Sequence, residues 1–218
     1  TTTNAWCGFW VSIGGPSSSA ARYQIDLRTG GATTIVSGLY AQPGTASHIY
    51  LYVPVKISSG VAIDARVRTT VSSGTIRLSL VGVVDATTCP PGYSSMFALA
   101  SLDTAATRLG STSVPFTNAW TSLGTTAAAA SAFYVAIGQS STATTVAQMV
   151  AVSVGTGGTG SEIEVARFNR QTTSGSAAWP HPYSPLFNYA IPSGTQINAR
   201  IAAADTTDIT LINLYGLN

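Results

Sequence analysis

A segment in the first half of the chain returns near its C-terminus. Residues 55–67 (VKISSGVAIDARV) align without a gap with residues 189–201 (YAIPSGTQINARI), at an offset of 191 − 57 = 134. The alignment continues as far as Val83 and Leu217, and Asn4-Ala5-Trp6 recurs as Asn118-Ala119-Trp120 at an offset of 114. Only two copies at this spacing indicate a duplicated domain rather than a solenoid.

The amino-acid composition is that of a folded protein with a weakly charged surface. Of 218 residues, 45% are hydrophobic and only 8% are charged, so disorder is excluded. Hydroxyl-rich surfaces repel copies of themselves less than charged ones do, which favours an assembling protein over the alternative of a neutral secreted domain. The net charge of +2 comes from scattered cations, which excludes a nucleic-acid interface, and no apolar run is long enough to span a membrane.

Alternating hydrophobic residues predict an all-β protein with antiparallel strands and no helix. We expect the strand of residues 61–67 to bury one face, with Val61, Ile63, Ala65 and Val67 pointing inward. The expected strands of the two copies are residues 9–13, 23–27, 49–55, 61–67 and 75–83, and then 133–137, 149–154, 162–168, 196–201 and 209–217. Short strands joined by Gly- and Ser-rich turns are typical of sandwiches, so we predict two tandem jelly-roll-like β-sandwiches.

The repeat also predicts the domain boundaries. The first sandwich should span residues 1–84, a connector residues 85–98, and the second sandwich residues 99–218. The second copy opens with a segment, residues 99–120, that has no counterpart in the first. Either the first domain is trimmed or its missing strand comes from elsewhere. A sandwich that lacks a strand exposes an edge, so we expect a partner near the N-terminus.

One glycine pattern matches a cofactor-binding motif, but the residues that follow it argue against a cofactor site. Residues 155–160 (GTGGTG) match the G-x-G-x-x-G pattern of dinucleotide-binding proteins, which requires a helix directly afterwards. Here the next residues, 161–165, have a strand pattern. The first copy carries glycines at the matching place, Gly30 and Gly31. We therefore predict a hairpin turn and no cofactor.

The titratable residues do not form a catalytic or metal-binding pattern. The two histidines, His48 and His181, fall at nearly equivalent places in the two copies, which favours a shared loop over one active site. No nucleophile motif accompanies them, and two lone cysteines, Cys7 and Cys89, make an unlikely metal site but a possible disulfide. We expect no enzyme activity, no metal and no cofactor.

Aromatic residues in loops are the candidate contact sites. Trp179, His181 and Tyr183 lie in a proline-stiffened run, WPHPY, and Tyr93 and Trp6 lie in the connector and the N-terminal segment. Exposed aromatic side chains stack on sugars or anchor protein interfaces. Three interpretations stay open: a loop that caps the sandwich, a protein interface, and a glycan contact.

Several segments resemble a module of tailed-bacteriophage virion proteins. The resemblance rests on residues 102–110, 120–123, 133–137 and above all 191–200 (IPSGTQINAR), and it covers the second copy and most of the first. It implies jelly-roll-like β-sandwich domains and a structural role in a virion, as a decoration, fibre-base or tail-associated protein. It implies partners among virion proteins and copies of the chain itself. A host-glycan-binding module and a secreted surface-filament subunit are the alternatives.

Overall fold

The structure is a computed structural model of the whole chain. It describes residues 1–17, 22–42, 48–70, 72–84, 92–99, 107–110, 116, 119–139, 149–171, 182–203 and 209–218. Throughout these residues the secondary structure is β, in fourteen strands without a helix, so the predicted all-β class is confirmed. The described part of the chain accordingly contains no helix long and apolar enough to cross a membrane.

The chain divides into two compact units. The first comprises Thr1–Phe97 with Leu217–Asn218, and the second comprises Ala98–Gly216. The division falls inside β7 and before the last residue of β14. Each unit is described by itself.

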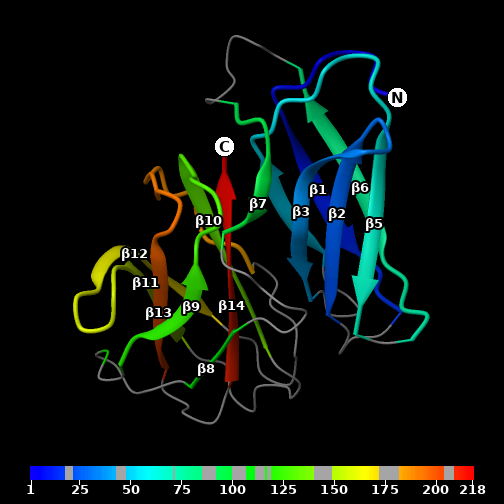
Figure 1. The fold of residues 1–218 in the computed structure, drawn as a ribbon. Coiled ribbons are helices and arrows are strands. Elements are labelled where there is room, and N and C mark those ends of the chain that lie inside the picture. The colour runs from blue at the N-terminus through cyan, green and yellow to red at the C-terminus, as the bar shows by residue number, and fades with distance from the viewer. Residues whose placement is uncertain are drawn as a thin grey trace. The chain divides into compact units, whose positions relative to one another are not determined.

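The strands of the first unit belong to two sheets and pair mostly in antiparallel (Figure 1). Its strands are β1 (Gly8–Gly14), β2 (Tyr23–Thr29), β3 (Thr33–Ala41), β4 (Ile49–Val53), β5 (Ile63–Thr69), β6 (Arg77–Val83) and β7 (Met96–Ala98). One sheet has the order β4-β1-β6, and in the other β3, β2 and β5 are neighbours. The short β7 pairs in parallel with β3, through Val36 and Met96.

Alternation along these strands creates the core of the first unit. Phe9 and Val11 of β1, and Ile25 and Leu27 of β2, are fully buried. Each such side chain stabilises the fold by about 1.5–3 kcal/mol relative to an exposed position. Two sheets that each bury one face make the unit β-sandwich-like.

The second unit also consists of paired β-strands (Figure 1). Its strands are β8 (Thr107–Gly110), β9 (Thr121–Thr125), β10 (Ala132–Gln139), β11 (Met149–Thr156), β12 (Ile163–Gln171), β13 (Gln196–Ala203) and β14 (Ile209–Leu217). One sheet has the order β12-β11-β13-β9, and β14 pairs with both β10 and β8. Fully buried residues such as Phe133, Val152 and Ile201 supply its core.

The same backbone contacts recur at positions related by the repeat. Thr2 donates its hydroxyl to the Ser58 carbonyl at 2.8 Å, and Thr126 donates to the Pro192 carbonyl at 2.8 Å. The acceptors are 192 − 58 = 134 residues apart, which is the sequence repeat, and the donors are 126 − 2 = 124 apart. The two contacts are therefore built in the same way, although in the second unit β8 and β9 precede Thr126.

The structure places the Asn-Ala-Trp recurrence differently from the sequence alignment. Trp6 bridges to Ile57, and the matching bridge in the second unit joins Ile191 to Ala130. Trp120 instead lies directly before β9, a strand that the described first unit does not contain. The expectation that Trp6 and Trp120 are equivalent is wrong, because the three matching letters fall at different places in the two pairing patterns.

The glycine-rich run after β11 forms the predicted hairpin turn. β11 ends at Thr156 and β12 begins at Ile163, and the two strands are paired in antiparallel. Gly157 and Gly160 have φ values of 114° and 82°, a backbone conformation that glycine adopts without strain. No helix follows, so the run lacks the helix N-terminus that a dinucleotide pyrophosphate needs.

Two expectations about the first unit are wrong. Ala65 and Val67 of β5, predicted to point into the core, are exposed. In addition, β3 (Thr33–Ala41) was not predicted. Its alternation is interrupted near Gly38, where the pairing with β2 shifts register between Ile25 and Leu27.

Candidate binding surface

The outer face of the sheet β4-β1-β6 carries a row of exposed aromatic and apolar side chains. Phe9, Val11 and Ile13 point into the core, so the side chains between them point outward. Trp10 on β1 is 48% exposed, and it is the outward residue at the middle of the sheet. The alternation of β1 therefore puts a large indole on the surface of a well-packed sheet.

Both neighbouring strands extend this row. Trp10 lies opposite Tyr52 on β4 and opposite Val81 on β6. The ring centroids of Trp10 and Tyr52 are 5.4 Å apart at an angle of 53°, a favourable tilted contact between aromatic rings. Tyr50 and Val81 are 58% and 63% exposed. We call Trp10, His48, Tyr50, Tyr52 and Val81 the aromatic face.

Glycines let the rings at the margin of the aromatic face lie flat on the sheet. A Cβ atom added to Gly14 would lie 2.2 Å from the His48 ring, and one added to Gly8 would lie 2.2 Å from the Tyr52 hydroxyl. The His48 and Tyr50 rings stack with centroids 6.3 Å apart. Small residues beneath large rings give a broad and shallow surface.

The described part of this face carries no carboxylate, and the cation Arg77 of β6 lies at its margin, opposite Gly14. Burial raises the pKa of Tyr52, so its hydroxyl stays protonated at neutral pH. The acidic residues of the described first unit, Asp26 and Asp64, lie on β2 and β5 and thus on the other sheet. Hydroxyl groups and aromatic rings without carboxylates suit the stacking and hydrogen bonding of an uncharged partner.

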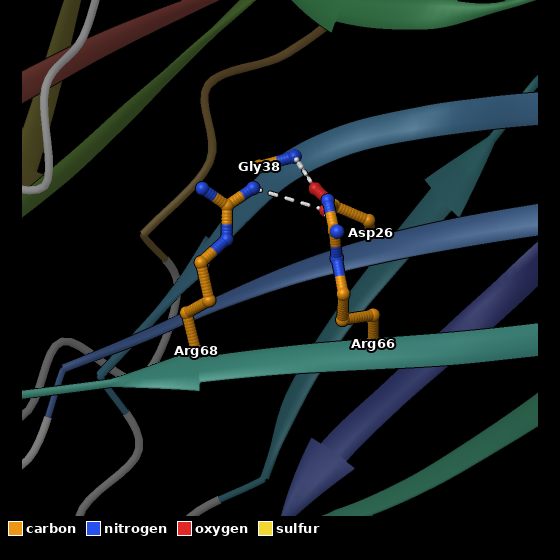
Figure 2. A network of polar contacts seen from close by, with 4 residues as sticks. All are labelled: Asp26, Gly38, Arg66 and Arg68. Carbon is orange, nitrogen blue, oxygen red and sulfur yellow. Dashed lines mark hydrogen bonds and ion pairs between the residues drawn. The ribbon is translucent and has the colours of Figure 1, made fainter.

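A second polar cluster lies on the other sheet of the first unit (Figure 2). Asp26 on β2, only 2% exposed, accepts hydrogen bonds from Arg66 at 2.6 and 3.0 Å and from Arg68 at 3.0 Å. Figure 2 shows both arginines rising from β5 to converge on this carboxylate, with the Gly38 N–H of β3 donating at 2.8 Å. Burial alone would raise the pKa of Asp26, but the hydrogen bonds from Arg66, Gly38 and Arg68 outweigh it and hold the pKa below its usual value.

The Asp26 cluster joins three strands and has the chemistry of a structural contact. Both carboxylate oxygens of Asp26 accept hydrogen bonds from protein donors: Oδ1 from the Gly38 N–H, and Oδ2 from Arg66 and Arg68. The matching place in the second unit holds Ser153, and Glu164 from the next strand supplies the carboxylate to Ser153 and Arg167. Asp26 thus ties β5 to β2, whereas Glu164 pairs with Arg167 of its own strand and, at 3.5 Å, with Arg200 of β13.

The structure describes three of the five candidate contact residues. Tyr183 is buried, its ring lies 6.0 Å from that of Tyr215, and its carbonyl accepts a hydrogen bond from Arg170, which for this residue fits the capping interpretation among the three that were left open. Trp6 is half-buried and packs over Gly82. Tyr93 is half-buried as well.

Tyr93 and Trp6 have clear roles within the first unit. The Tyr93 N–H donates to the Pro54 carbonyl at 2.8 Å, and its own carbonyl accepts from the Lys56 N–H at 2.8 Å. The Trp6 N–H donates to the Ile57 carbonyl at 2.7 Å. Trp179 and His181 lie outside the described residues.

The cysteine prediction gains support. Cys7 is disulfide-bonded, and the chain has one other cysteine, Cys89, which lies outside the described residues. Among the described residues no group of three or more His, Cys, Asp or Glu side chains could hold a metal ion.

Sequence reasoning missed the aromatic face although a signal for it was present. Residues 49–53 (IYLYV) alternate strictly, which puts Tyr50 and Tyr52 together on the face opposite Ile49 and Leu51. The predicted contact residues were aromatic residues outside strands. Aromatic residues on the outward side of strands were not predicted as contacts. The union of three strands into one row could not be read from either strand alone.

Comparison with known proteins gives no family assignment. The chain matches no protein-family model. It matches no curated protein either.

Proposed function

We propose that this protein is a non-enzymatic structural subunit that assembles in many copies, and that the aromatic face is its contact with a second copy. The observation that carries the proposal is the exposed row of Trp10, Tyr50 and Val81 on a rigid sheet. Exposed apolar patches on ordered proteins mark interaction sites. Aromatic side chains also dominate the energetics of protein interfaces.

The charge distribution favours a second copy as the occupant of this face. Only 8% of the residues are charged, and the row itself carries no carboxylate. Two copies that meet through this face bring aromatic rings and hydroxyls together, while its cation, Arg77, lies at the margin opposite Gly14, as a self-complementary twofold contact centred on the rings allows. The resemblance to tailed-phage proteins suggests the setting, a virion, with the subunit in a capsid decoration, a fibre or the tail.

We also propose that the two units are copies of one ancestral jelly-roll-like domain. The shared pairing order supports this: β2 lies between β3 and β5, and β11 lies between β12 and β13. The equivalent hydroxyl contacts of Thr2 and Thr126 support it further. In this proposal the buried strands of the two domains make the subunit rigid, and the exposed surfaces of the domains contact neighbouring subunits.

The disulfide of Cys7 is consistent with a location outside a reducing compartment. Disulfide bonds persist in secreted proteins and on the surfaces of virions and cells, and they are rare in the cytosol. A virion, with an extracellular location as the alternative, meets this condition.

Glycan binding is the second candidate function, and the exposed rings of the aromatic face favour it. Trp10 and Tyr50 offer stacking surfaces, and the Tyr50 hydroxyl offers hydrogen bonds. This is the chemistry by which proteins hold sugar rings. The same residues therefore serve a receptor-binding module.

Sedimentation velocity over a range of protein concentrations separates these functions. The double variant Trp10→Ser with Tyr50→Ser should remove self-association that the wild type shows, whereas Tyr189→Ser, which removes another exposed aromatic ring, should leave it intact. A wild type that stays monomeric at every concentration contradicts assembly through this face. Saturable binding on a glycan array that the double variant loses supports the second candidate.

A further inference from the structure

The strand β5 of the first unit and the strand β13 of the second occupy equivalent places but have different neighbours. Ile63 and Ile197, at the starts of these strands, are 197 − 63 = 134 residues apart, which is the offset of the repeat. β13 is paired on both sides, with β11 and β9. β5 pairs with β2 and is the terminal strand of its sheet, so its outer edge has no strand partner among the described residues.

In the second unit, β9 and the residues before it cover this edge. β9 pairs with β13 from Ala199 to Gln196, and its Leu123 is 5% exposed, so this leucine adds to the core. Trp120, directly before β9, stacks on the guanidinium of Arg200 at 4.2 Å from the ring centroid. The covering segment thus contributes a strand, an apolar side chain and an aromatic ring.

The absence of such a cover in the first unit is visible in the exposure of equivalent residues. Ala199 is fully buried, whereas its counterpart Ala65 is exposed. The side chain of Arg200 is 22% exposed, whereas that of Arg66 is 59% exposed. The apolar side of β5 and the Arg66 side chain are therefore exposed where their counterparts in the second unit are covered. The described residues of the first unit provide no such covering segment.

The contacts of Thr2 and Thr126 indicate where a covering strand would end. Thr126 directly follows Thr125, the last residue of β9, and Thr2 makes the matching contact in the first unit. A strand that covers β5 as β9 covers β13 therefore ends beside Thr1. In this register its residues equivalent to Gly124 and Thr121 lie opposite Ile63 and Ala65.

We propose that the outer edge of β5 is an acceptor site for an extended segment with the side-chain pattern of residues 120–124. That pattern is an aromatic residue that stacks on Arg66, followed three residues later by a leucine that faces the core. Addition of a strand to an exposed sheet edge supplies backbone hydrogen bonds, and the alternate side chains supply specificity.

Occupancy argues against β9 as the donor. This strand has the required pattern, but it is already paired with β13. The donor is therefore a segment other than the described β9.

A synthetic peptide with the sequence of residues 116–124 (FTNAWTSLG) tests the site. We expect saturable binding to the full-length protein by fluorescence anisotropy, weakened at least tenfold in a peptide with Trp120→Ala and Leu123→Ser. Hydrogen exchange should slow in residues 63–66 on binding. No binding, equal binding of both peptides, or unchanged exchange there would overturn the proposal.

A protein extended at its N-terminus by a copy of residues 116–124 gives an independent readout. The added segment should occupy the β5 edge intramolecularly, raise the melting temperature and abolish binding of the added peptide. Unchanged binding by this extended protein, or a dimer formed through β5 itself, would contradict the inference. The Trp10→Ser, Tyr50→Ser variant should bind the peptide as the wild type does, which separates this site from the aromatic face.

Discussion

Asp26 and Arg66 form an ion pair with a 2.6 Å contact in which the carboxylate is buried and the guanidinium is half in solvent. Replacement of Asp26 by Asn leaves two arginines without their shared anion and removes charge-assisted hydrogen bonds. We expect Asp26→Asn to lower the free energy of unfolding by about 2–4 kcal/mol, measured by urea denaturation. Asp64→Asn, a change at an exposed site on the same sheet, should have little effect.

The stability of the first unit should also depend on pH through Asp26. Its pKa lies below the ordinary value of 3.8, so the charged carboxylate stabilises the folded state above that pH. This contribution is lost as the pH falls from about 4 through the lowered pKa. In acid-unfolding curves of wild type and Asp26→Asn, the difference in stability should therefore shrink below pH 4, and a difference that grows there would refute the assignment.

Two adjacent residues of β1 should differ sharply in their contributions to stability. Phe9 is fully buried, so Phe9→Ala should lower the free energy of unfolding by about 3–5 kcal/mol. Trp10 points outward, and Trp10→Ala should cost less than about 1 kcal/mol, as is usual for surface changes. Thermal unfolding of both variants tests the assignment of the two faces, and a large loss with Trp10→Ala would show that its ring is a core element.

The packing of Trp6 against Gly82 predicts a strict requirement for glycine. A Cβ atom at residue 82 would lie 2.0 Å from the Trp6 ring, so Gly82→Ala forces the indole to move and should lower stability by about 1–3 kcal/mol. Gly158→Ala is the matched control, because its added methyl group would have no neighbour closer than 3.7 Å. Equal melting temperatures for the two variants would contradict the placement of Trp6.

The disulfide of Cys7 should make the stability sensitive to reductant. A bond to Cys89 closes a loop of 89 − 7 = 82 residues, and a loop of this size stabilises a fold by about 2–4 kcal/mol through the unfolded state. We expect Cys7→Ser and the reduced wild type to lose stability equally. A thiol assay on the denatured, unreduced protein should find no reactive cysteine, and two reactive thiols per chain would exclude the bond.

The strands that the sequence predicted are those whose alternation is regular. Residues 9–13 have a regular apolar side that is fully buried, and residues 133–137 are buried throughout. β3 escaped prediction because its alternation breaks at Gly38, whose φ of 66° and neighbouring register shifts interrupt the period of two. Local pattern therefore identifies regular strands and fails at bulges.

The sequence was less informative about which faces are covered. Alternation assigned Ala65 and Val67 correctly to one side of β5, but whether that side is buried depends on neighbours distant in sequence. The same limit applies to the aromatic face, because Trp10, Tyr50 and Val81 meet only when three strands pair. Burial and surface patches are properties of the assembled sheets.

Hydroxyl-radical footprinting of the assembled protein tests the proposed contact most directly. We predict that the oxidation rates of Trp10 and Tyr50 fall several-fold between the monomer and the assembly, while that of Tyr189, also exposed in the isolated chain, stays the same. Unchanged oxidation of Trp10 and Tyr50 in an assembly that has formed would show that the subunits meet elsewhere, and the account of the aromatic face would be wrong.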